Sequence, residues 1–283
     1  MITIRASSTS NYLDCQARAA ISMFGDLFAE HGFKLRRPNV SIGALIGSGV
    51  HGAAEVGLKE SMAGRGLVAA STIEDAGIDA FRARRAEEEA EAEATIMDPV
   101  SCSIDDAETQ VRKMSRQYRL DVVAKAHPIA VENRIKVELR PGVIVSGQGD
   151  LLALDMVGGE VATIRDAKTS RHKTSALKHL TQLGTYGLLY RSEGLEPQAG
   201  QIDLIPRVAV TKPQPPIEEQ PINLLAAERM AWSTINDFAD KGEAFAKDGN
   251  PSRFLLNPSS NLCSPKYCRA YGTPACAATY NGD

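Results

Sequence analysis

Residues 149–168 have the sequence GDLLALDMVGGEVATIRDAK, which predicts two strands joined by a tight turn at Gly158-Gly159. Side chains alternate along a strand, so Asp166 and Lys168 are expected to point to the same side. The turn folds their strand back beside the strand that carries Asp150. The two carboxylates can therefore meet at one point, with the lysine next to them.

Two neighbouring carboxylates predict a divalent-cation site. Carboxylate oxygens are the ligands that Mg²⁺ and Mn²⁺ prefer. A lysine beside such a cation can position or activate an attacking water and offset the charge that develops on a phosphate. Asp-x-Lys also occurs by chance in most proteins, and an exposed, salt-bridged strand end explains it when it stands alone.

The chain around this hairpin alternates between helical and strand-like patterns without an internal repeat. Its 283 residues, 43% of them apolar, are enough to bury a substantial core. We expect one mixed α/β domain over residues 1–283, ending in a cysteine-rich tail at 249–283. The expected helices are Ser8–Phe28, Ile42–Glu60, Ile73–Ala94, Asp105–Ala126, Ser175–Arg191 and Ile222–Phe245, and the expected strands are Val131–Leu139, Gly142–Asp155, Val161–Lys168 and Gln201–Thr211.

The helix after the hairpin carries polar side chains at helical spacing. Lys178, Gln182 and Tyr186 are each separated by four residues, so they are expected along one face of the helix. A separate stripe of leucines is expected to enter the core: Leu177, Leu180 and Leu188.

Upstream, His51 and Glu55 lie one helical turn apart. A single histidine in a helix is more often structural than functional, so it gains weight only from the other polar residues. Gly47–Gly52 also matches the dinucleotide fingerprint G-x-G-x-x-G, which requires a βαβ unit around it. A helical pattern follows instead, and we expect no dinucleotide site.

Taken in order, four motifs resemble the RecB-like branch of the PD-(D/E)XK nucleases over roughly residues 8–280, with 62–130 as a helical, insertion-like segment. The motifs are Gly-x-x-x-His (Gly47–His51), Gly-Asp (Gly149-Asp150), Asp-x-Lys (Asp166–Lys168) and Gln-x-x-x-Tyr (Gln182–Tyr186). This resemblance implies a restriction-endonuclease-like α/β core, whose mixed central sheet is flanked by helices.

The resemblance also implies roles for individual residues. Lys168 would be the catalytic lysine, and Gln182 and Tyr186 would orient it and the DNA phosphates. Glu138 matches the position of an auxiliary acid in some members. The ligands implied for Mg²⁺ or Mn²⁺ are His51, Asp150, Asp166 and the carbonyl oxygen of Ala167.

Four of the five cysteines form a second signal, because thiolates are soft ligands that suit zinc or an iron–sulfur cluster. They are Cys15, Cys263, Cys268 and Cys276. One N-terminal and three C-terminal cysteines resemble the [4Fe–4S] staple of CRISPR-adaptation and helicase-associated RecB-type nucleases, which joins the chain ends and leaves the nuclease core free. The tail spacing C-x₄-C-x₇-C is wider than the C-x₂-C-x₅-C of that group, so structural Zn²⁺ and unligated thiols stay open. Cys102 is expected to be a bystander.

Charge is unevenly distributed, although the net charge is only −3. Residues 112–140 carry eight Lys or Arg against three acids, and residues 165–178 carry five against one. Such local basic patches suit a polyanion-binding cleft, although ordinary surface lysines give the same pattern. We predict that Arg171, Lys173 and Lys178 contact DNA near the scissile phosphate.

Together these features predict a Mg²⁺- or Mn²⁺-dependent deoxyribonuclease, an exonuclease acting in recombination, repair or DNA-end processing. The helicase motif G-x-x-x-x-G-K-[ST] is absent, so the protein is expected to act alone or beside a recombination or helicase partner protein. No run of 18 apolar residues and no secretory signal is found, and the family resemblance implies a bacterial or phage-encoded cytoplasmic protein. The alternative is a non-catalytic nucleic-acid-binding or assembly protein that retains the nuclease fold.

Overall fold

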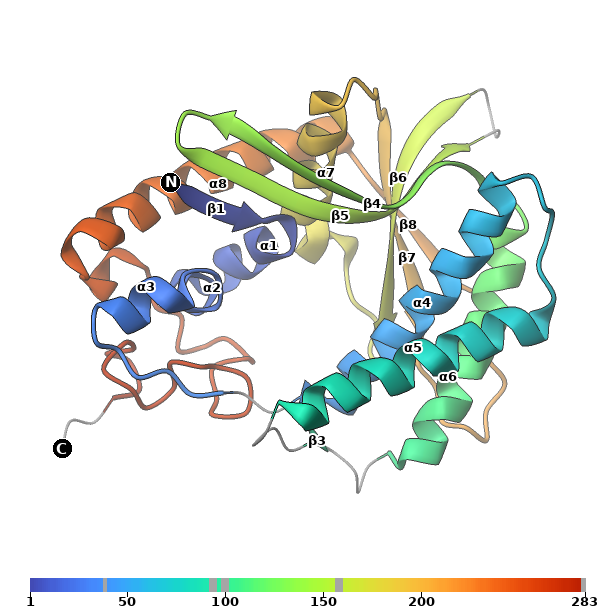
Figure 1. Ribbon diagram of the computed structural model, residues 1–283, viewed down its shortest axis with the longest axis horizontal. Coiled ribbons are helices and arrows are strands. Elements are labelled where there is room, and N and C mark those ends of the chain that lie inside the picture. The colour runs from blue at the N-terminus through green and yellow to red at the C-terminus, as the bar shows by residue number, and fades with distance from the viewer. Residues whose placement is uncertain (38–39, 92–95, 98–101, 156–159, 281–283) are drawn as a thin grey trace.

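A central sheet crosses the molecule, and helices cover both of its faces (Figure 1). The structure, a computed structural model, describes residues 1–37, 40–91, 96–97, 102–155 and 160–280. The strands are β1 (Ile2–Arg5), β4 (His127–Arg140), β5 (Val143–Asp155), β6 (Val161–Ser170), β7 (Ala199–Pro206) and β8 (Glu218–Ile222), with a separate short pair of β2 (Val40–Ser41) and β3 (Ile96–Met97). The helices are α1 (Ala6–Asp14), α2 (Gln16–Met23), α3 (Gly25–Glu30), α4 (Ile42–Met62), α5 (Ala70–Ala90), α6 (Ile104–Tyr118), α7 (Leu180–Ser192) and α8 (Leu224–Asp248).

The sheet contains the meander expected from the sequence. β5 pairs antiparallel with both β4 and β6, while the residues 157–159 of the predicted turn lie outside the described part of the chain. β7 then pairs parallel with β6, which α7 permits as the crossover between them. The result is the predicted mixed sheet. Its hydrogen-bonded neighbours follow the order β1-β5-β6-β7-β8, and β4 pairs with β5 in addition.

Two strands of the central sheet were not expected, nor was the short β2–β3 pair. β1 has only four residues and pairs parallel with the beginning of β5. β8 has the sequence EEQPI, pairs antiparallel with β7 and ends at Ile222, and α8 begins at Leu224, two residues after the expected start of that helix. A proline and two acids are typical of an edge strand, because the outer side of such a strand needs no sheet hydrogen bonds.

The sheet separates two hydrophobic cores. Alternate residues of β5 enter opposite layers: Leu152 packs in the core with α1–α3, α7 and α8, and Leu151 packs in the core with α4–α6. The segment between residues 62 and 130, expected as an insertion, therefore supplies α5 and α6 to one face of the sheet. Figure 1 shows these two groups of helices on opposite sides of the strands.

The expected helix Ser8–Phe28 is three helices, interrupted at Cys15 and Phe24. Cys15 has extended backbone angles (φ −151°, ψ 109°). Beside this break, the backbone N–H of Ala17 donates to the carbonyl of Leu255, 3.2 Å away. The C-terminal tail thus docks where the helix is broken, a contact that helical periodicity does not reveal.

The glycines of the G-x-G-x-x-G match lie inside α4, so the expected absence of a dinucleotide fold agrees with the helix found there. Two of them, Gly49 and Gly52, bring α4 close to α5. A Cβ atom added at Gly49 would lie 2.9 Å from the carbonyl oxygen of Gly77. These glycines therefore permit close helix packing rather than phosphate binding.

Within the described residues, no helix combines the length and the apolar character that crossing a bilayer requires.

Candidate active site

The end of the β5–β6 pairing brings Asp150 to β6. The paired residues run from Asp155–Val161 to Leu151–Arg165. Directly beyond them, the backbone N–H of Ala167 donates to Asp150 Oδ2 at 2.8 Å. The aspartate side chain thus replaces the next backbone contact between the strands and holds Asp150 against the Asp166-Ala167-Lys168 segment.

Asp166 and Lys168 point to the same side of β6 and form an ion pair. Lys168 Nζ lies 2.6 Å from Asp166 Oδ2, and the aspartate side chain is 1% exposed. Burial by itself lowers the pKa of Lys168, but the carboxylates of Asp166 and Asp150 outweigh burial and raise it. Lys168 is therefore an ammonium at neutral pH, suited to stabilise negative charge and to donate a proton.

Helix α7 holds Asp166 from the other side. Gln182 Nε2 lies 3.4 Å from Asp166 Oδ1 and donates to Tyr186 Oη at 2.9 Å. Both side chains are buried. Gln182 thus contacts Asp166, which pairs with Lys168. Gln182 can therefore position the lysine only through Asp166.

The leucine stripe expected on this helix is wrong at its first position. Residues Ala176–His179 form a 3₁₀ turn before α7, and Leu177 is 69% exposed. Leu183 and Leu189 enter the core instead. The change from three residues per turn to 3.6 rotates Leu177 away from the stripe.

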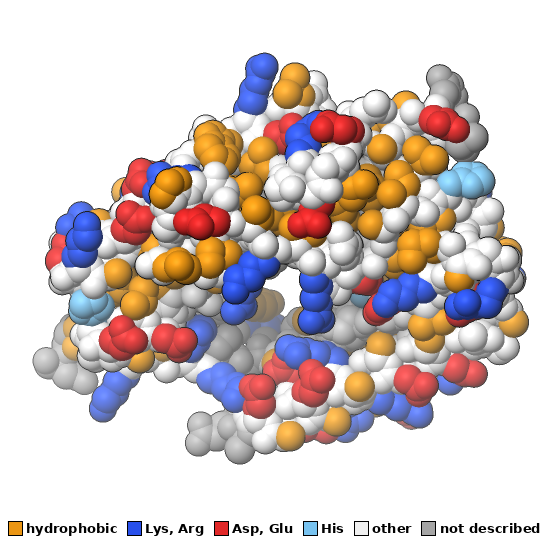
Figure 2. All heavy atoms as spheres, turned by 45° about the horizontal axis from the view of Figure 1, so that its top comes forward, with side chains coloured by type: hydrophobic (Ala, Val, Ile, Leu, Met, Phe, Trp, Pro, Cys, Tyr) orange, Lys and Arg blue, Asp and Glu red, His pale blue; other side chains and the backbone are white. Residues whose placement is uncertain are grey.

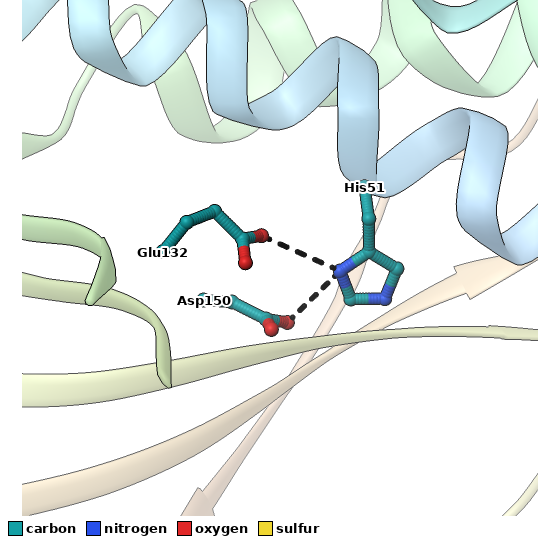
Figure 3. Close-up of side chains that lie close together, drawn as sticks. All are labelled: His51, Glu132 and Asp150. Carbon is teal, nitrogen blue, oxygen red and sulfur yellow. Dashed lines mark ion pairs between the residues drawn. The ribbon is translucent and has the colours of Figure 1, made fainter. Parts of the chain in front are cut away.

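His51 approaches the same point from α4 and faces two carboxylates (Figure 3). His51 Nδ1 lies 3.3 Å from Asp150 Oδ2 and 3.9 Å from Glu132 Oε1. One potential ligand atom from each of these three residues lies within 4.8 Å of the others. Asp166 stands outside this group, because its oxygens face Lys168 and Gln182.

Glu132 is the site residue that sequence reasoning missed. It lies on β4, where its backbone has a positive φ of 48°, the sole such value for a non-glycine residue in the described chain. Gln148 donates from Nε2 to Glu132 Oε2 and accepts from Arg134 Nε at 2.7 Å. A strained backbone held by such contacts is typical of functional sites.

Glu138, the acid expected at this position from the sequence, lies elsewhere. Its carboxylate accepts a hydrogen bond from the backbone N–H of Gly142 at 2.7 Å, at the β4–β5 turn. The expected helical partner of His51 is also absent from the site, because Glu55 pairs with Lys59 at 2.5 Å. Strand periodicity does not distinguish Glu138 from Glu132, and helix periodicity points to Glu55. The register of β4 against β5 places Glu132, rather than the other two, beside His51.

The His51, Glu132 and Asp150 set fits a divalent cation. Burial raises the pKa of Asp150 to about 7, although His51 opposes the shift. Asp150 in turn raises the pKa of His51 to about 9, chiefly through its negative charge. Two crowded acids favour positive charge beside them, which a protonated His51 provides when no metal is bound. A divalent cation would replace that proton and match the ligand preference of carboxylates.

Lys168 lies where two surface hollows meet. One hollow, of about 490 Å³, is lined by His51, Ala167, Lys168 and Arg171, and the other, of about 590 Å³, by Lys168, Lys178 and Gln182. Figure 2 shows Lys and Arg side chains gathered around a hollow in the middle of the molecule. Two of the three cations expected on a DNA path, Arg171 and Lys178, thus lie beside Lys168.

Lys173 is not in either hollow. It is 82% exposed and lies 3.6 Å from Glu218, at a separate depression. The basic stretch 112–140 is also mostly engaged in structural pairs, such as Arg112 with Asp75 and Arg116 with Glu74. Of that stretch, Arg134 and Lys136 line a third hollow that also contains Tyr186.

The glycine before Asp150 has a steric reason. A Cβ atom at Gly149 would lie 2.5 Å from Tyr190 Oη, and Tyr190 is fully buried. We expect Gly149→Ala to destabilise the fold by about 1–3 kcal/mol through overpacking, seen as a lower melting temperature. Gly47→Ala is the control, because its Cβ would make only an ordinary 3.4 Å contact with Thr169. A melting temperature unchanged by Gly149→Ala would contradict this account.

The four predicted metal-binding cysteines line one small cavity where the tail meets α1 and α2: Cys15, Cys263, Cys268 and Cys276. Cys102 lies apart, buried in the α4–α6 core. The family resemblance implies that the tail leaves the core of the domain free. In this structure the tail instead contributes to a hollow of that core. Ser260, Asn261 and Leu262 form part of the wall of the hollow that contains Lys168.

Of the comparisons with known proteins, one identifies the family of this chain. No curated protein matches the chain. Among solved structures, one titled "Crystal structure of SSO0001" is similar, with 21% sequence identity over 54% of this chain and 69% of that chain, and a TM-score of 0.25, too low to support an argument. A model of the PD-(D/E)XK nuclease superfamily matches residues 4–271, nearly the whole chain. The mixed α/β sheet flanked by helices agrees with this match, and the chain belongs to the PD-(D/E)XK nuclease superfamily.

Proposed function

We propose that this protein is a Mg²⁺- or Mn²⁺-dependent deoxyribonuclease that hydrolyses phosphodiester bonds. The observation that carries the proposal is the pairing of Lys168 with Asp166 at 2.6 Å beside the His51, Glu132 and Asp150 group. Imidazole among carboxylates favours Mn²⁺ over Mg²⁺, because nitrogen is a softer ligand than oxygen. Asp166 and the carbonyl oxygen of Ala167 complete the proposed ligand set from the adjacent strand.

Each side chain has a distinct proposed task. A bound cation would supply Lewis acidity and a water of lowered pKa. The Lys168 ammonium would offset negative charge that builds on the phosphate, and Asp166 fixes its position. Gln182, which also hydrogen-bonds Tyr186, would restrain Asp166 from α7, while Arg171 and Lys178 would contact phosphates on either side. Such phosphate contacts carry little sequence information, so we expect little sequence preference.

We further propose that the enzyme belongs to the RecB-like branch and acts as an exonuclease on DNA ends in recombination or repair. The order of the motifs from Gly47–His51 to Gln182–Tyr186 supports this placement. A recombination or helicase protein would be its partner, in a bacterial or phage-infected cytoplasm. These finer assignments come from the family resemblance.

The test uses linear and covalently closed circular DNA of one sequence, with Mg²⁺, Mn²⁺ or EDTA. Degradation of the linear form alone, and only with a cation, is the expected result. Nicking or linearisation of the circle would instead identify an endonuclease. Binding of both forms without any cleavage would favour the alternative of a non-catalytic nucleic-acid-binding protein.

The four tail-associated cysteines are proposed to hold a [4Fe–4S] cluster. The four cysteines line one small cavity where the tail meets α1 and α2, which supports a shared metal centre. The cluster itself follows from the family resemblance, and structural Zn²⁺ is the alternative. Hydrogen bonds already join the same segments, including Asn257 Nδ2 to the carbonyl of Asp14 at 2.8 Å.

Removing one cysteine is expected to release the metal and to loosen both chain ends. We expect Cys15→Ala to lose its iron and to lower the melting temperature by about 10 °C or more, because metal-binding free energy contributes to folding. Cys102→Ala is the matched control and should retain full metal content. Iron and zinc analysis of both variants decides the ligand set. Metal lost from the Cys102 variant but kept by the Cys15 variant would contradict it.

A further inference from the structure

The two carboxylate oxygens of Glu132 have different surroundings. Oε1 lies 3.9 Å from His51 Nδ1 and faces the cluster that fits a cation (Figure 3). Oε2 instead accepts a hydrogen bond from Gln148 Nε2, on the neighbouring strand β5. One oxygen is therefore turned toward the cluster while the other is engaged by the amide, which gives the carboxylate a defined orientation.

The backbone of Glu132 needs support from outside its own strand. Its φ of 48° is a left-handed conformation, which is unfavourable for a residue that carries a Cβ atom. In the β4–β5 register it lies between the pairs Val131–Leu151 and Asn133–Gly149. Such a conformation persists where neighbouring contacts hold it. The hydrogen bond from Gln148 is a contact of this kind, because it joins the Glu132 side chain to β5.

Arg134 fixes the direction of the Gln148 amide. The two residues face each other across the β4–β5 pairing, and Arg134 Nε donates to Gln148 Oε1 at 2.7 Å. A guanidinium has only donors, so the amide oxygen must face Arg134 and the amide nitrogen is left for Glu132. An ionised carboxylate only accepts, so Glu132 requires the same orientation from its side. The three side chains thus form one directed chain from guanidinium to amide to carboxylate.

We propose that Gln148, oriented by Arg134, is a positioning residue that holds Glu132 for metal binding. The inference rests on the proposed nuclease function and adds two residues that lie outside the four sequence motifs. Both act through Glu132 and not on the reacting atoms. A ligand that is already oriented loses less conformational freedom when the cation binds. Hydrogen-bond partners of metal ligands typically change metal affinity or activity 10- to 100-fold when they are replaced.

A Mn²⁺ titration of the melting temperature tests Gln148 without relying on cleavage. Gln148→Ala should raise the Mn²⁺ concentration that gives half of the maximal increase by about tenfold or more. In EDTA its melting temperature should stay close to the wild-type value, because Gln148 is only half-buried. A merely structural role would lower the melting temperature in EDTA and leave the Mn²⁺ midpoint unchanged. A midpoint within about twofold of the wild-type value would overturn the inference.

Replacing Arg134 separates positioning from charge. Loss of a nearby positive charge by itself favours cation binding, whereas loss of positioning weakens it. We expect Arg134→Ala to raise the Mn²⁺ midpoint, and the double variant with Gln148→Ala to raise it no further than Gln148→Ala alone, because both act through one contact. A lower midpoint in Arg134→Ala, or additive shifts in the double variant, would contradict the directed chain.

Lys136→Ala is the matched control for Arg134→Ala. Lys136 is the next exposed cation on β4 and lines the same hollow as Arg134, but it faces Ser146 across the strand pair. Its removal should therefore leave the Mn²⁺ midpoint at or below the wild-type value. A midpoint raised as much as in Arg134→Ala would show that the effect does not pass through Gln148, and the inference would fail.

The wild-type protein distinguishes this inference from the proposed function. If Mn²⁺ raises its melting temperature and supports cleavage, while Gln148→Ala keeps the same midpoint, the positioning role is wrong and the nuclease function stands. If Mn²⁺ neither raises the wild-type melting temperature nor supports cleavage, both fail.

Discussion

Replacing Asp150 with asparagine is expected to reduce the rate of DNA hydrolysis by about 10³-fold or more. Asp150 links the parts of the site: it lies 3.3 Å from His51 and accepts a hydrogen bond from the N–H of Ala167. Asparagine keeps the shape but removes the negative charge that would hold a cation. Single-turnover cleavage of a labelled linear DNA measures the loss.

A second measurement on the same variant does not depend on activity. A ligand that binds only the folded state raises its stability, so Mn²⁺ should raise the melting temperature of the wild-type protein. The Asp150→Asn variant should lose most of this increase. Asp26→Asn, an exposed residue of α3, should keep both the rate and the increase. Asp150→Asn retaining more than about a tenth of the rate would remove this carboxylate from the mechanism.

Replacing Lys168 with alanine is expected to lower kcat by about 10²-fold or more, with a smaller effect on the Mn²⁺-induced rise in melting temperature. The ammonium lies 2.6 Å from Asp166, where it would meet charge that is larger in the transition state than in the bound substrate. Steady-state kinetics should show the loss in kcat rather than in KM.

Lys178→Ala provides the comparison for Lys168→Ala. Lys178 lines the same hollow but is exposed, at the 3₁₀ turn before α7. Its contact with a phosphate would be made equally in the ground state and the transition state, so its loss should raise KM and leave kcat nearly unchanged. The opposite pattern, with kcat lowered by Lys178→Ala and KM raised by Lys168→Ala, would reverse the two assignments.

Local sequence accounts for the part of the site carried by neighbouring elements. Asp166 and Lys168 share a side of β6 because strand geometry alternates side chains. Gln182 and Tyr186 contact each other because four residues make about one turn of α7. The position of Asp150 follows from the β5–β6 pairing, which consecutive strands favour. In each case the residues that meet are close together in the sequence, or they recur with the period of one strand or helix.

The remaining features depend on contacts between distant segments, which no local period encodes. Whether Glu132 or Glu138 reaches His51 is decided by the register of β4 against β5 and by the positive φ at Glu132. The break at Cys15 depends on the tail, whose Leu255 accepts the hydrogen bond from Ala17. Periodicity predicts Leu177 in the core, yet a 3₁₀ turn leaves it exposed in the lining of the hollow that also contains Lys168. Local sequence patterns were thus enough to predict the meander strands, Asp150, Asp166 and Lys168, and the resemblance to the nuclease family. The third residue of the cluster, Glu132, and the set of side chains that line the hollows around Lys168 depend on tertiary packing, because separate elements must meet in space to form both.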